Sequence, residues 1–462
     1  MYAELSSIKS DPFFVLFKKN LKDNFRIKKK EKILLCVSGG LDSMALLFLF
    51  MQLKYYRIQI AHVNYKSRKE SDKDMDLVKF VSDKYEIPFF SSSFLPESMG
   101  NGENFEAWAR NKRYEYFEKI SNENSIDWIA TGHNKNDNVE TLFLNLSRKT
   151  GLSGLRGIPE RREKVFRPLL KFSKFQIKSF SVRNRIPYSN DKSNNNQKYY
   201  RNFIRHTILK NWEEYDHNII CSLNSSINHF IDWNNAIDSL IKKVFIDNIR
   251  INNSRIKIPY KLIDEIPINI IIRIFQLVTV EKNVLWKKHE LYGIKKFISS
   301  KRIGKKLNIK HKWVFVHDRD IIIGEKIFLI NNKKSKNLKI EKEVIFNDHI
   351  YRLSLKNRKN LFFKNNNNCE FINWDLIKNK KLVIRRWKAG DFFYPLGMNS
   401  RQKLSDFLIN NKLDYFSKLR QTVMTADGKI FWVCGKRISN WVKINKNTKE
   451  IALLEKIKNN YD

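Results

Sequence analysis

The sequence has no long apolar run and few cysteines. No stretch approaches the roughly 18 uncharged apolar residues of a membrane-spanning helix, and the opening MYAELSSIKSDPFF lacks the charged-then-apolar pattern of a secretory signal. The four cysteines, Cys36, Cys221, Cys369 and Cys434, lie far apart, and none belongs to a C-x-x-C pair. This spacing argues against a zinc knuckle, a redox dithiol or a secreted disulfide framework. We therefore expect a cytoplasmic protein with free thiols and no membrane partner.

Acidic residues are scarce relative to basic ones. The chain has 88 Lys and Arg against 48 Asp and Glu, which gives a formal net charge of +40. Such a field attracts polyanions, and nucleic acid is the natural partner. A general richness in lysine and asparagine, as in KKNLKDNFRIKKKEK (18–32), explains part of the excess. The remainder favours RNA or DNA over a membrane surface, because no long amphipathic anchor accompanies the charge.

The 462 residues predict about three domains. The first two hundred residues alternate strand-like runs (KILLCV, IQIAHVNY, PFFSSSF, IDWIATGH) with helix-like runs, which is typical of a doubly wound parallel α/β sheet. We assign this sheet to a catalytic domain over 1–215. The rest divides into a mainly helical domain (216–330), a linker with short strands (331–380) and a small α+β domain (381–462).

The hexapeptide SGGLDS separates the first predicted strand from the next predicted helix. Its two glycines let the backbone approach a phosphate closely, and the helix N-terminus offers unpaired N–H groups and a positive dipole end. Its serines can donate hydrogen bonds, whereas its carboxylate needs Mg²⁺ or a nearby lysine beside phosphates. We predict a pyrophosphate cradle with a metal ligand, formed by Ser38, Gly39, Gly40, Leu41, Asp42 and Ser43.

The alternative for this hexapeptide is a tight structural turn with Ser or Asp as a helix cap. Its spacing fits neither G-x-x-x-x-G-K-[ST] nor G-x-G-x-x-G. A second polar cluster, TGHNKND (131–137), follows the fourth predicted strand. Ligands of doubly wound sheets bind beyond the carboxyl ends of the strands, so both clusters are expected at one site.

SGG-x-DS after a strand resembles the signature of the N-type ATP pyrophosphatases, which split ATP between the α and β phosphates and adenylate a carbonyl oxygen. Further motifs resemble the tRNA(Ile)-lysidine synthase family over about residues 30–212 and 370–450. These motifs are AHVNYKSR (61–68), EAWARNKRYEYF (106–117), TGHNKNDNVETLFLNLSRKTGLSGLRGI (131–158), RPLL (167–170), SNDKSNNNQKYYRNFIRHTIL (189–209) and RRWKAGDFFYPLGMNSRQKLSDFLINNKL (385–413).

The resemblance implies a ligase reaction in two steps. ATP adenylates O2 of the wobble cytidine in the CAU anticodon of tRNA(Ile) and releases pyrophosphate, and free L-lysine then attacks C2 through its ε-amino group and releases AMP. ATP is thus a substrate, and Mg²⁺ is the expected ion, held by Asp42 and Asp137.

By the same resemblance, His133 contacts phosphate or acts as acid or base, and Glu140 orients the lysine ammonium. The predicted catalytic residues are Asp42, His133, Asp137 and Glu140. The predicted tRNA contacts are Arg113, Arg201, Arg205, Arg385, Arg386 and Lys403.

Four positions depart from the family pattern. Asn134 stands where the family has His, Asn136 where it has Asp, Tyr65 where a His is common, and Lys149 where it has Gly. We expect activity to survive on the retained residues. The alternatives are a catalytically weakened RNA-binding relative and a tRNA thiolase on the same fold, although a thiolase needs catalytic cysteines that this spacing does not offer.

Overall fold

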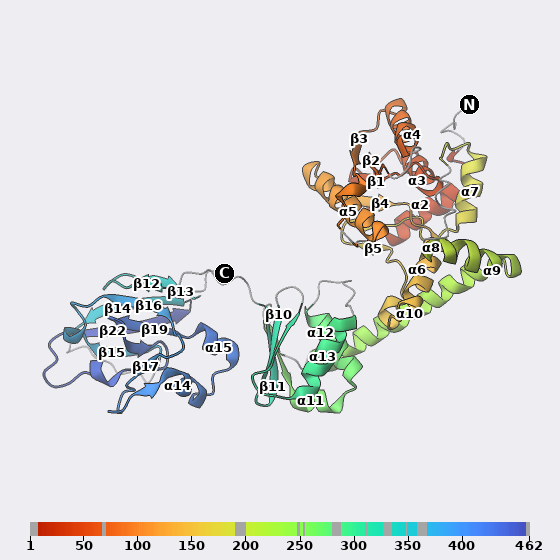
Figure 1. The fold of residues 1–462 in the computed structure, drawn as a ribbon. Coiled ribbons are helices and arrows are strands. Elements are labelled where there is room, and N and C mark those ends of the chain that lie inside the picture. Colours follow the sequence, from red (N-terminus) through yellow and green to blue (C-terminus); the bar gives the residue numbers. More distant parts are fainter. Residues whose placement is uncertain are drawn as a thin grey trace. The chain divides into compact units, whose positions relative to one another are not determined.

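The computed structural model describes residues 8–458 except 67–70, 101, 103, 190–199, 247–249, 253–254, 280–287, 310–312, 327–334, 348 and 358–366 (Figure 1). The chain forms two compact units, Met1–Leu240 and Ile241–Asp462. None of the helices within the described ranges is long and apolar enough to cross a membrane.

The first unit is built on a mainly parallel sheet, as predicted. Across the sheet the strands are β3 (Phe89–Ser93), β2 (Arg57–Asn64), β1 (Lys32–Cys36), β4 (Trp128–Thr131), β6 (Val165–Phe166) and β5 (Arg161–Arg162). Only β5, of these six, runs antiparallel to its neighbour. Because β1 lies between β2 and β4, the loops that follow β1 and β4 meet at one edge.

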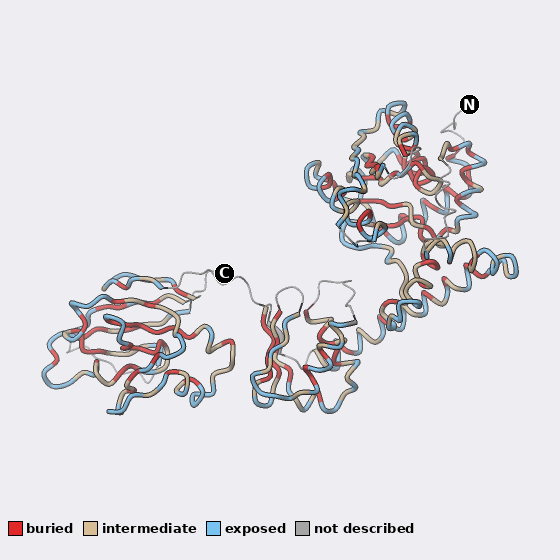
Figure 2. The backbone as a smooth tube through the Cα atoms, viewed as in Figure 1, coloured by how far each residue is buried: buried red, intermediate tan, exposed pale blue. Residues whose placement is uncertain are grey.

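Helices cover both faces of this sheet, so the expected doubly wound class is confirmed (Figures 1 and 2). Ile33 and Leu35 of β1 pack into one core with α2, α3, α4 and α7, whereas Leu34 packs with α5 on the other face. The helices are α2 (Pro12–Asn24), α3 (Leu41–Met51), α4 (Ser71–Lys84), α5 (Phe105–Glu123), α6 (Lys135–Ser147) and α7 (Lys174–Arg183). The alternation of side chains along a strand divides β1 between the two cores.

A helical extension completes the first unit. It consists of α8 (Tyr200–Phe203), the π-helical turn η4 (Ile204–Leu209), α9 (Lys210–Tyr215) and α10 (Ile219–Ile241). Ile220 and Ile227 of α10 share a buried core with Val139 and Leu142 of α6. The division between the two units falls after Leu240, one residue before the end of α10, whereas the sequence suggested a boundary at 215.

The second unit begins with helices and a sheet together. The helices are α11 (Tyr260–Glu265), α12 (Ile268–Thr279) and α13 (Lys288–Ser300), and the antiparallel sheet has the order β7 (Arg250–Asn252), β8 (Arg255–Pro259), β11 (Ile321–Lys326), β10 (Trp313–Asp318) and β9 (Lys306–Ile309). The strands β9, β10 and β11 lie within 216–330, which was expected to be mainly helical. The expectation of a mainly helical segment missed β7 and β8, because β8 pairs with β11 far along the chain and β7 pairs with β8.

The C-terminal part of the second unit contains two larger antiparallel sheets and a short hairpin. One sheet has the order β12 (Ser335–Asn337), β16 (Leu382–Arg386), β19 (Thr422–Ala426), β20 (Lys429–Val433), β21 (Arg437–Ile438), and the other β13 (Val344–Phe346), β14 (His349–Lys356), β22 (Ile451–Lys458), β15 (Cys369–Asn373). The hairpin is β17 (Phe392–Phe393) with β18 (Gln402–Lys403), and the helices are α14 (Leu404–Asn410) and α15 (Tyr415–Arg420). This is the expected α+β class.

The segment 331–380, expected as a linker with short strands, supplies strands to both larger sheets. β12 pairs with β16, and β14 pairs with β22 along eight residues. β13 pairs with β14 within the segment, whereas β16 and β22 lie later in the chain, so local sequence alone did not reveal the pairing with them.

Candidate functional site

The SGGLDS loop connects β1 to α3 at a point where two backbones come very close. Gly39 has φ +87°, and a Cβ there would lie 3.1 Å from the carbonyl oxygen of Asp74. A Cβ on Gly132, after β4, would lie 3.2 Å from the backbone nitrogen of Ser43. Glycine at these two positions therefore permits a left-handed turn and the contact between the two loops.

Hydroxyl groups close the loop on itself. The Ser43 hydroxyl accepts a hydrogen bond from the Ser38 backbone N–H at 3.1 Å and donates to the Gly40 carbonyl at 2.9 Å. The two serine hydroxyls are also 3.1 Å apart. Gly40 is the N-cap of α3 and makes no side-chain cap hydrogen bond, so the helix terminus keeps backbone N–H groups that suit an anion.

Asp42 lies in the first turn of α3 and carries an incompletely satisfied charge. Its Oδ1 atom is buried without a hydrogen-bond partner. Burial, followed by the nearby Asp137 carboxylate, raises the pKa of Asp42 from 3.8 to about 6, although Lys174 and a hydrogen bond from the Asn134 side chain oppose the shift. A cation beside this carboxylate would stabilise its ionised form.

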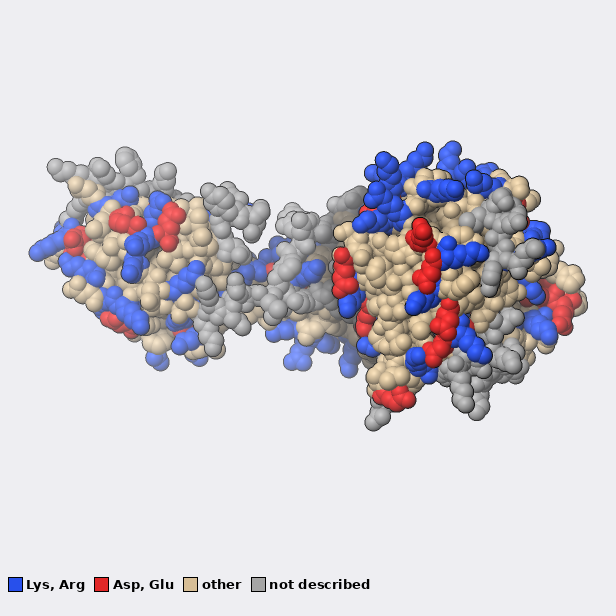
Figure 3. Space-filling view, turned by 90° about the horizontal axis from the view of Figure 1, so that it is seen from above, with Lys and Arg blue, Asp and Glu red and all other residues tan. Residues whose placement is uncertain are grey.

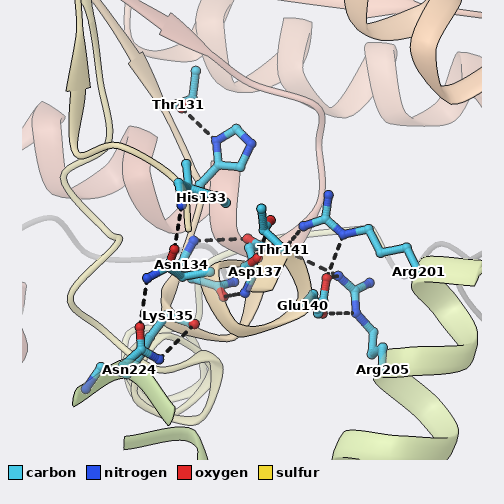
Figure 4. Close-up of polar contacts among 12 residues, drawn as sticks. Thr131, His133, Asn134, Lys135, Asp137, Glu140, Thr141, Arg201, Arg205 and Asn224 are labelled. Carbon is cyan, nitrogen blue, oxygen red and sulfur yellow. Dashed lines mark hydrogen bonds and ion pairs between the residues drawn. The ribbon is translucent and has the colours of Figure 1, made fainter. Parts of the chain in front are cut away.

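Asp137 and Asn134 form a capping box at the start of α6 (Figure 4). Asn134 Oδ1 accepts a hydrogen bond from the Asp137 backbone N–H, and Asp137 Oδ2 accepts one from the Asn134 backbone N–H, both at 3.0 Å. Asn136 Oδ1 accepts a hydrogen bond from the Lys174 N–H at the start of α7, at 3.0 Å. Asn134 thus caps α6, a role that suits asparagine, whereas Asn136 lies in the first turn of α6 and accepts a hydrogen bond from α7, whose own N-cap is Ser173.

Glu140 is buried beneath two arginines rather than open to a ligand. Its carboxylate accepts hydrogen bonds from Arg201 Nε at 2.7 Å and from Arg205 Nε at 2.6 Å (Figure 4). Both arginines also contact Asp137 Oδ1, at 3.1 and 3.4 Å. Burial lowers the pKa of each arginine, but the two carboxylates more than offset this effect, so both pKa values rise. In this structure, therefore, Glu140 holds Arg201 and Arg205.

His133 lies after β4 with its Nδ1 atom 2.8 Å from Thr131 Oγ1 (Figure 4). Burial, and then the charges of four arginines, lower the pKa of the imidazole well below its usual value. The ring is thus neutral near pH 7. It suits a hydrogen bond to phosphate or base better than a cationic contact.

A cavity of about 830 Å³ lies at the carboxyl ends of β1 and β4. Ten of the predicted residues line it: Ser38, Gly40, Leu41, Asp42, Ser43, Arg113, His133, Asp137, Arg201 and Arg205. Gly39 and Glu140 are not among the lining residues, because Gly39 packs against Asp74 and Glu140 is buried under the arginines.

The lining residues that were not predicted include Asp74, Tyr114, Lys174 and Lys178. Tyr114 belongs to the motif that contributed Arg113. Lys174 and Lys178 share one face of α7 at a spacing of four residues, a signal available in the sequence. Asp74 carried no signal beyond its place on an amphipathic helix.

The three predicted tRNA contacts of the second unit differ in whether their side chains are already paired within the protein. Arg385 binds Asp391 through two hydrogen bonds of 2.7 and 2.8 Å. Arg386 donates a hydrogen bond to Asn347 Oδ1 at 3.0 Å. Lys403, in β18, is exposed to solvent. Of the three, Lys403 therefore presents its charge most openly.

The departure at Lys149 allows a stability prediction. Lys149 has φ +55°, a left-handed conformation that costs about 1 kcal/mol for a residue with a side chain. We expect Lys149→Gly to raise the free energy of unfolding by about 1 kcal/mol, measured by urea denaturation. Lys119→Gly, inside α5, is the control and should lower it by about 1 kcal/mol. A lower free energy of unfolding in Lys149→Gly would contradict the inference that the backbone is strained at Lys149.

Comparison with known proteins extends these observations to the whole chain. The model of a PP-loop domain matches residues 15–212. A curated tRNA(Ile)-lysidine synthase of Pseudothermotoga lettingae is 30% identical over 442 residues, with 92% of this chain and 90% of that protein covered. The protein of the same name from Bacteroides thetaiotaomicron is 28% identical over 438 residues (92% and 95% covered), and that from Clostridium perfringens 29% over 457 residues (93% and 96%).

These similarities span both units, and the PP-loop match contains all the predicted site residues of the first unit. The chain belongs to the tRNA(Ile)-lysidine synthase family.

Proposed function

We propose that this chain is a ligase that joins free L-lysine to C2 of the wobble cytidine of tRNA(Ile) with a CAU anticodon. ATP is consumed to AMP and pyrophosphate through an adenylated cytidine. The observation that carries the proposal is the cavity, in which the SGGLDS loop, Asp42 and Asp137 lie together with arginines and lysines. Family membership points to the same reaction.

The loop and α7 provide groups that suit the triphosphate. Ser38, Ser43 and the N-terminus of α3 offer hydrogen-bond donors, whereas Lys174 and Lys178 supply positive charge at the same cavity. Cytosine O2 is a poor leaving group, so adenylation precedes attack. Fixed donors and cations around the departing pyrophosphate stabilise charge that develops in that step.

The carboxylates fit a magnesium ion. Asp42 Oδ1 is buried without a partner, and the Asp137 charge is near enough to raise the Asp42 pKa. Mg²⁺ commonly binds one or two carboxylates and completes its shell with water and substrate phosphates. When bound, it would neutralise charge on the pyrophosphate. We therefore assign its ligands to Asp42 and Asp137.

The second substrate, tRNA, suits the charge of the chain. Lysine and arginine side chains are spread over the surfaces of both units (Figure 3). We propose that Arg113 and Lys403 contact RNA and that Arg201 and Arg205 act near the reacting groups through Asp137 and Glu140. Arg385 and Arg386 would first have to leave Asp391 and Asn347. A cytoplasmic site of action follows from this substrate.

The cysteines do not favour the thiolase alternative. Cys36 lines the cavity, but burial raises the pKa of its thiol and so disfavours the reactive thiolate. Cys221 lies exposed in α10, and the other two cysteines lie in the second unit.

The decisive experiment is incorporation of radiolabelled lysine into an unmodified tRNA(Ile) transcript with ATP and Mg²⁺. A methionine tRNA transcript with the same anticodon is the control. We expect label in the isoleucine tRNA alone. If the protein instead binds tRNA tightly but neither incorporates label nor catalyses ATP–pyrophosphate exchange, it is a catalytically weakened RNA-binding relative.

A further inference from the structure

A second group of cations lies beside the part of the cavity that α5 forms, and Arg113 is its one lining member. Arg113 and Tyr114 line the cavity. Arg113 Nε donates a hydrogen bond to the Tyr65 hydroxyl at 2.9 Å, and Arg167 Nη2 donates one to the Tyr114 hydroxyl at 3.3 Å. The guanidinium of Arg110 lies 5.0 Å from the centre of the Tyr114 ring. Tyr114 thus contacts two arginines of this group, which we call the α5 arginine cluster (Arg110, Arg113 and Arg167).

No carboxylate balances this cluster within the described part of the chain. Arg167 is only 3% exposed, its Nη1 atom donates to the Pro159 carbonyl, and its Nε atom has no hydrogen-bond partner. Glu106, one turn before Arg110, also lines the cavity, yet no ion pair joins it to the cluster in the described ranges. A buried ion without an opposite charge costs several kcal/mol, so the cluster would bind an oxyanion favourably.

The neighbouring charges act on the pKa of Arg110. Burial lowers the pKa of Arg110, and the charges of Arg167 and Arg113 lower it further, although Tyr114 partly opposes them. An anion that bound here would relieve this repulsion. The cluster therefore has the properties of a binding subsite rather than of a structural ion pair.

The reaction offers two oxyanions besides ATP: the α-carboxylate of lysine and the RNA phosphodiester. Free lysine carries an α-ammonium beside its carboxylate and a second ammonium on its side chain, and three guanidinium groups would repel both. A phosphodiester carries one negative charge and no attached cation. Arginine forks also match phosphate oxygens well.

We propose that Arg110 and Arg113 bind the phosphodiester backbone next to the reacting cytidine, and that the buried Arg167 adds positive charge behind Tyr114. This assignment rests on the proposed function. It gives the E-x-x-A-R-x-x-R-Y motif and the arginine of RPLL one shared task, which is to fix the nucleotide against the cavity while its base reaches Asp42 and Asp137.

Arg110→Met tests the cluster. Arg110 as a whole is exposed, although its guanidinium is partly desolvated against the Tyr114 ring, so its loss should leave the fold intact. We expect this variant to bind an anticodon stem-loop RNA about tenfold more weakly, with the slope of log affinity against log salt reduced by about one. The KM for lysine should stay unchanged. Lys119→Met, on the same helix and 68% exposed, is the matched control and should alter neither quantity.

The contact between the arginines and the RNA backbone can be tested with an RNA that carries methylphosphonate linkages on both sides of the cytidine. We expect these uncharged linkages to weaken binding to the unsubstituted protein but to have little further effect in Arg110→Met. An equal penalty in both proteins, or a raised lysine KM with unchanged RNA affinity, would overturn the proposal. These RNA-binding measurements need no turnover, so they can be made even if the protein does not ligate lysine. The incorporation assay tests ligation separately.

Discussion

Asp42→Asn is expected to reduce lysine ligation by about 10³-fold and, at the same time, to stabilise the ligand-free protein near pH 7. The loss of activity follows because the site loses a charged ligand for Mg²⁺ beside the pyrophosphate. The gain in stability follows because the carboxylate is buried, one of its oxygens has no partner, and Asp137 repels it. Asparagine removes the charge and keeps the shape.

The pH dependence of that gain has a definite sign. The folded-state pKa of Asp42, about 6, lies above 3.8, so the protonated carboxyl is the form that favours folding. The stability it contributes is present below pH 4 and is lost as the pH rises through about 6. At pH 7 the substitution should therefore gain about 2 to 3 kcal/mol, and below pH 4 it should gain almost nothing.

Urea denaturation from pH 4 to 8, with and without Mg²⁺ and ATP, measures this effect. Mg²⁺ with ATP should stabilise the unsubstituted protein more than the variant. Asp72→Asn is the control, because hydrogen bonds from Lys66 and Asn64 lower the pKa of Asp72, and its removal should not stabilise the protein. Normal ligation by Asp42→Asn, or no gain at pH 7, would refute the assignment.

Glu140→Gln should destabilise the first unit more than any surface substitution. Glu140 is 1% exposed, and its carboxylate accepts three hydrogen bonds from Arg201 and Arg205. A neutral amide would leave two partly buried guanidinium groups with Asp137 as their remaining carboxylate. Breaking one side of a buried ion pair costs about 3 to 5 kcal/mol, which corresponds to a fall of about 10 °C in the Tm of a unit of this size.

Thermal unfolding followed by circular dichroism measures this loss. Glu115→Gln, which removes an exposed carboxylate paired with Lys112 on α5, is the matched control and should change the Tm little. The double variant Glu140→Gln with Arg201→Met should recover part of the loss, because it removes one unpaired charge. A double variant less stable than Glu140→Gln would show that Arg201 contributes by packing rather than by its charge.

The part of the candidate site that lies at the carboxyl ends of strands could be predicted from the sequence. SGGLDS and TGHNKND were each placed after a buried strand, and adjacency of β1 and β4 brings Asp42 and Asp137 together. The doubly wound class followed from the alternation of strands and helices. These predictions were accurate because they depend on local patterns and on one general rule of sheet topology.

The side-chain partners of the arginines could not be predicted in this way. Arg201 and Arg205 lie more than sixty residues after Glu140, yet they bind its carboxylate. Arg385, which we expect to contact RNA, also binds Asp391, only six residues away, and the sequence pattern did not reveal this partner. Whether a basic side chain faces solvent or an internal carboxylate is decided by tertiary packing.

The capping box at the start of α6 divides one carboxylate between two tasks. Asp137 Oδ2 is committed to the Asn134 backbone N–H, whereas Oδ1 faces Arg201 and Arg205. During evolution, a change at position 134 is therefore tolerated when the new residue still accepts a hydrogen bond from the helix, as asparagine does. A substitution to Ala or Val at position 134 would remove this hydrogen bond and destabilise the first turn of α6. The Oδ1 atom of Asp137 would then be displaced from Arg201 and Arg205. An engineer who transplants this site should accordingly move residues 134 to 137 as one block.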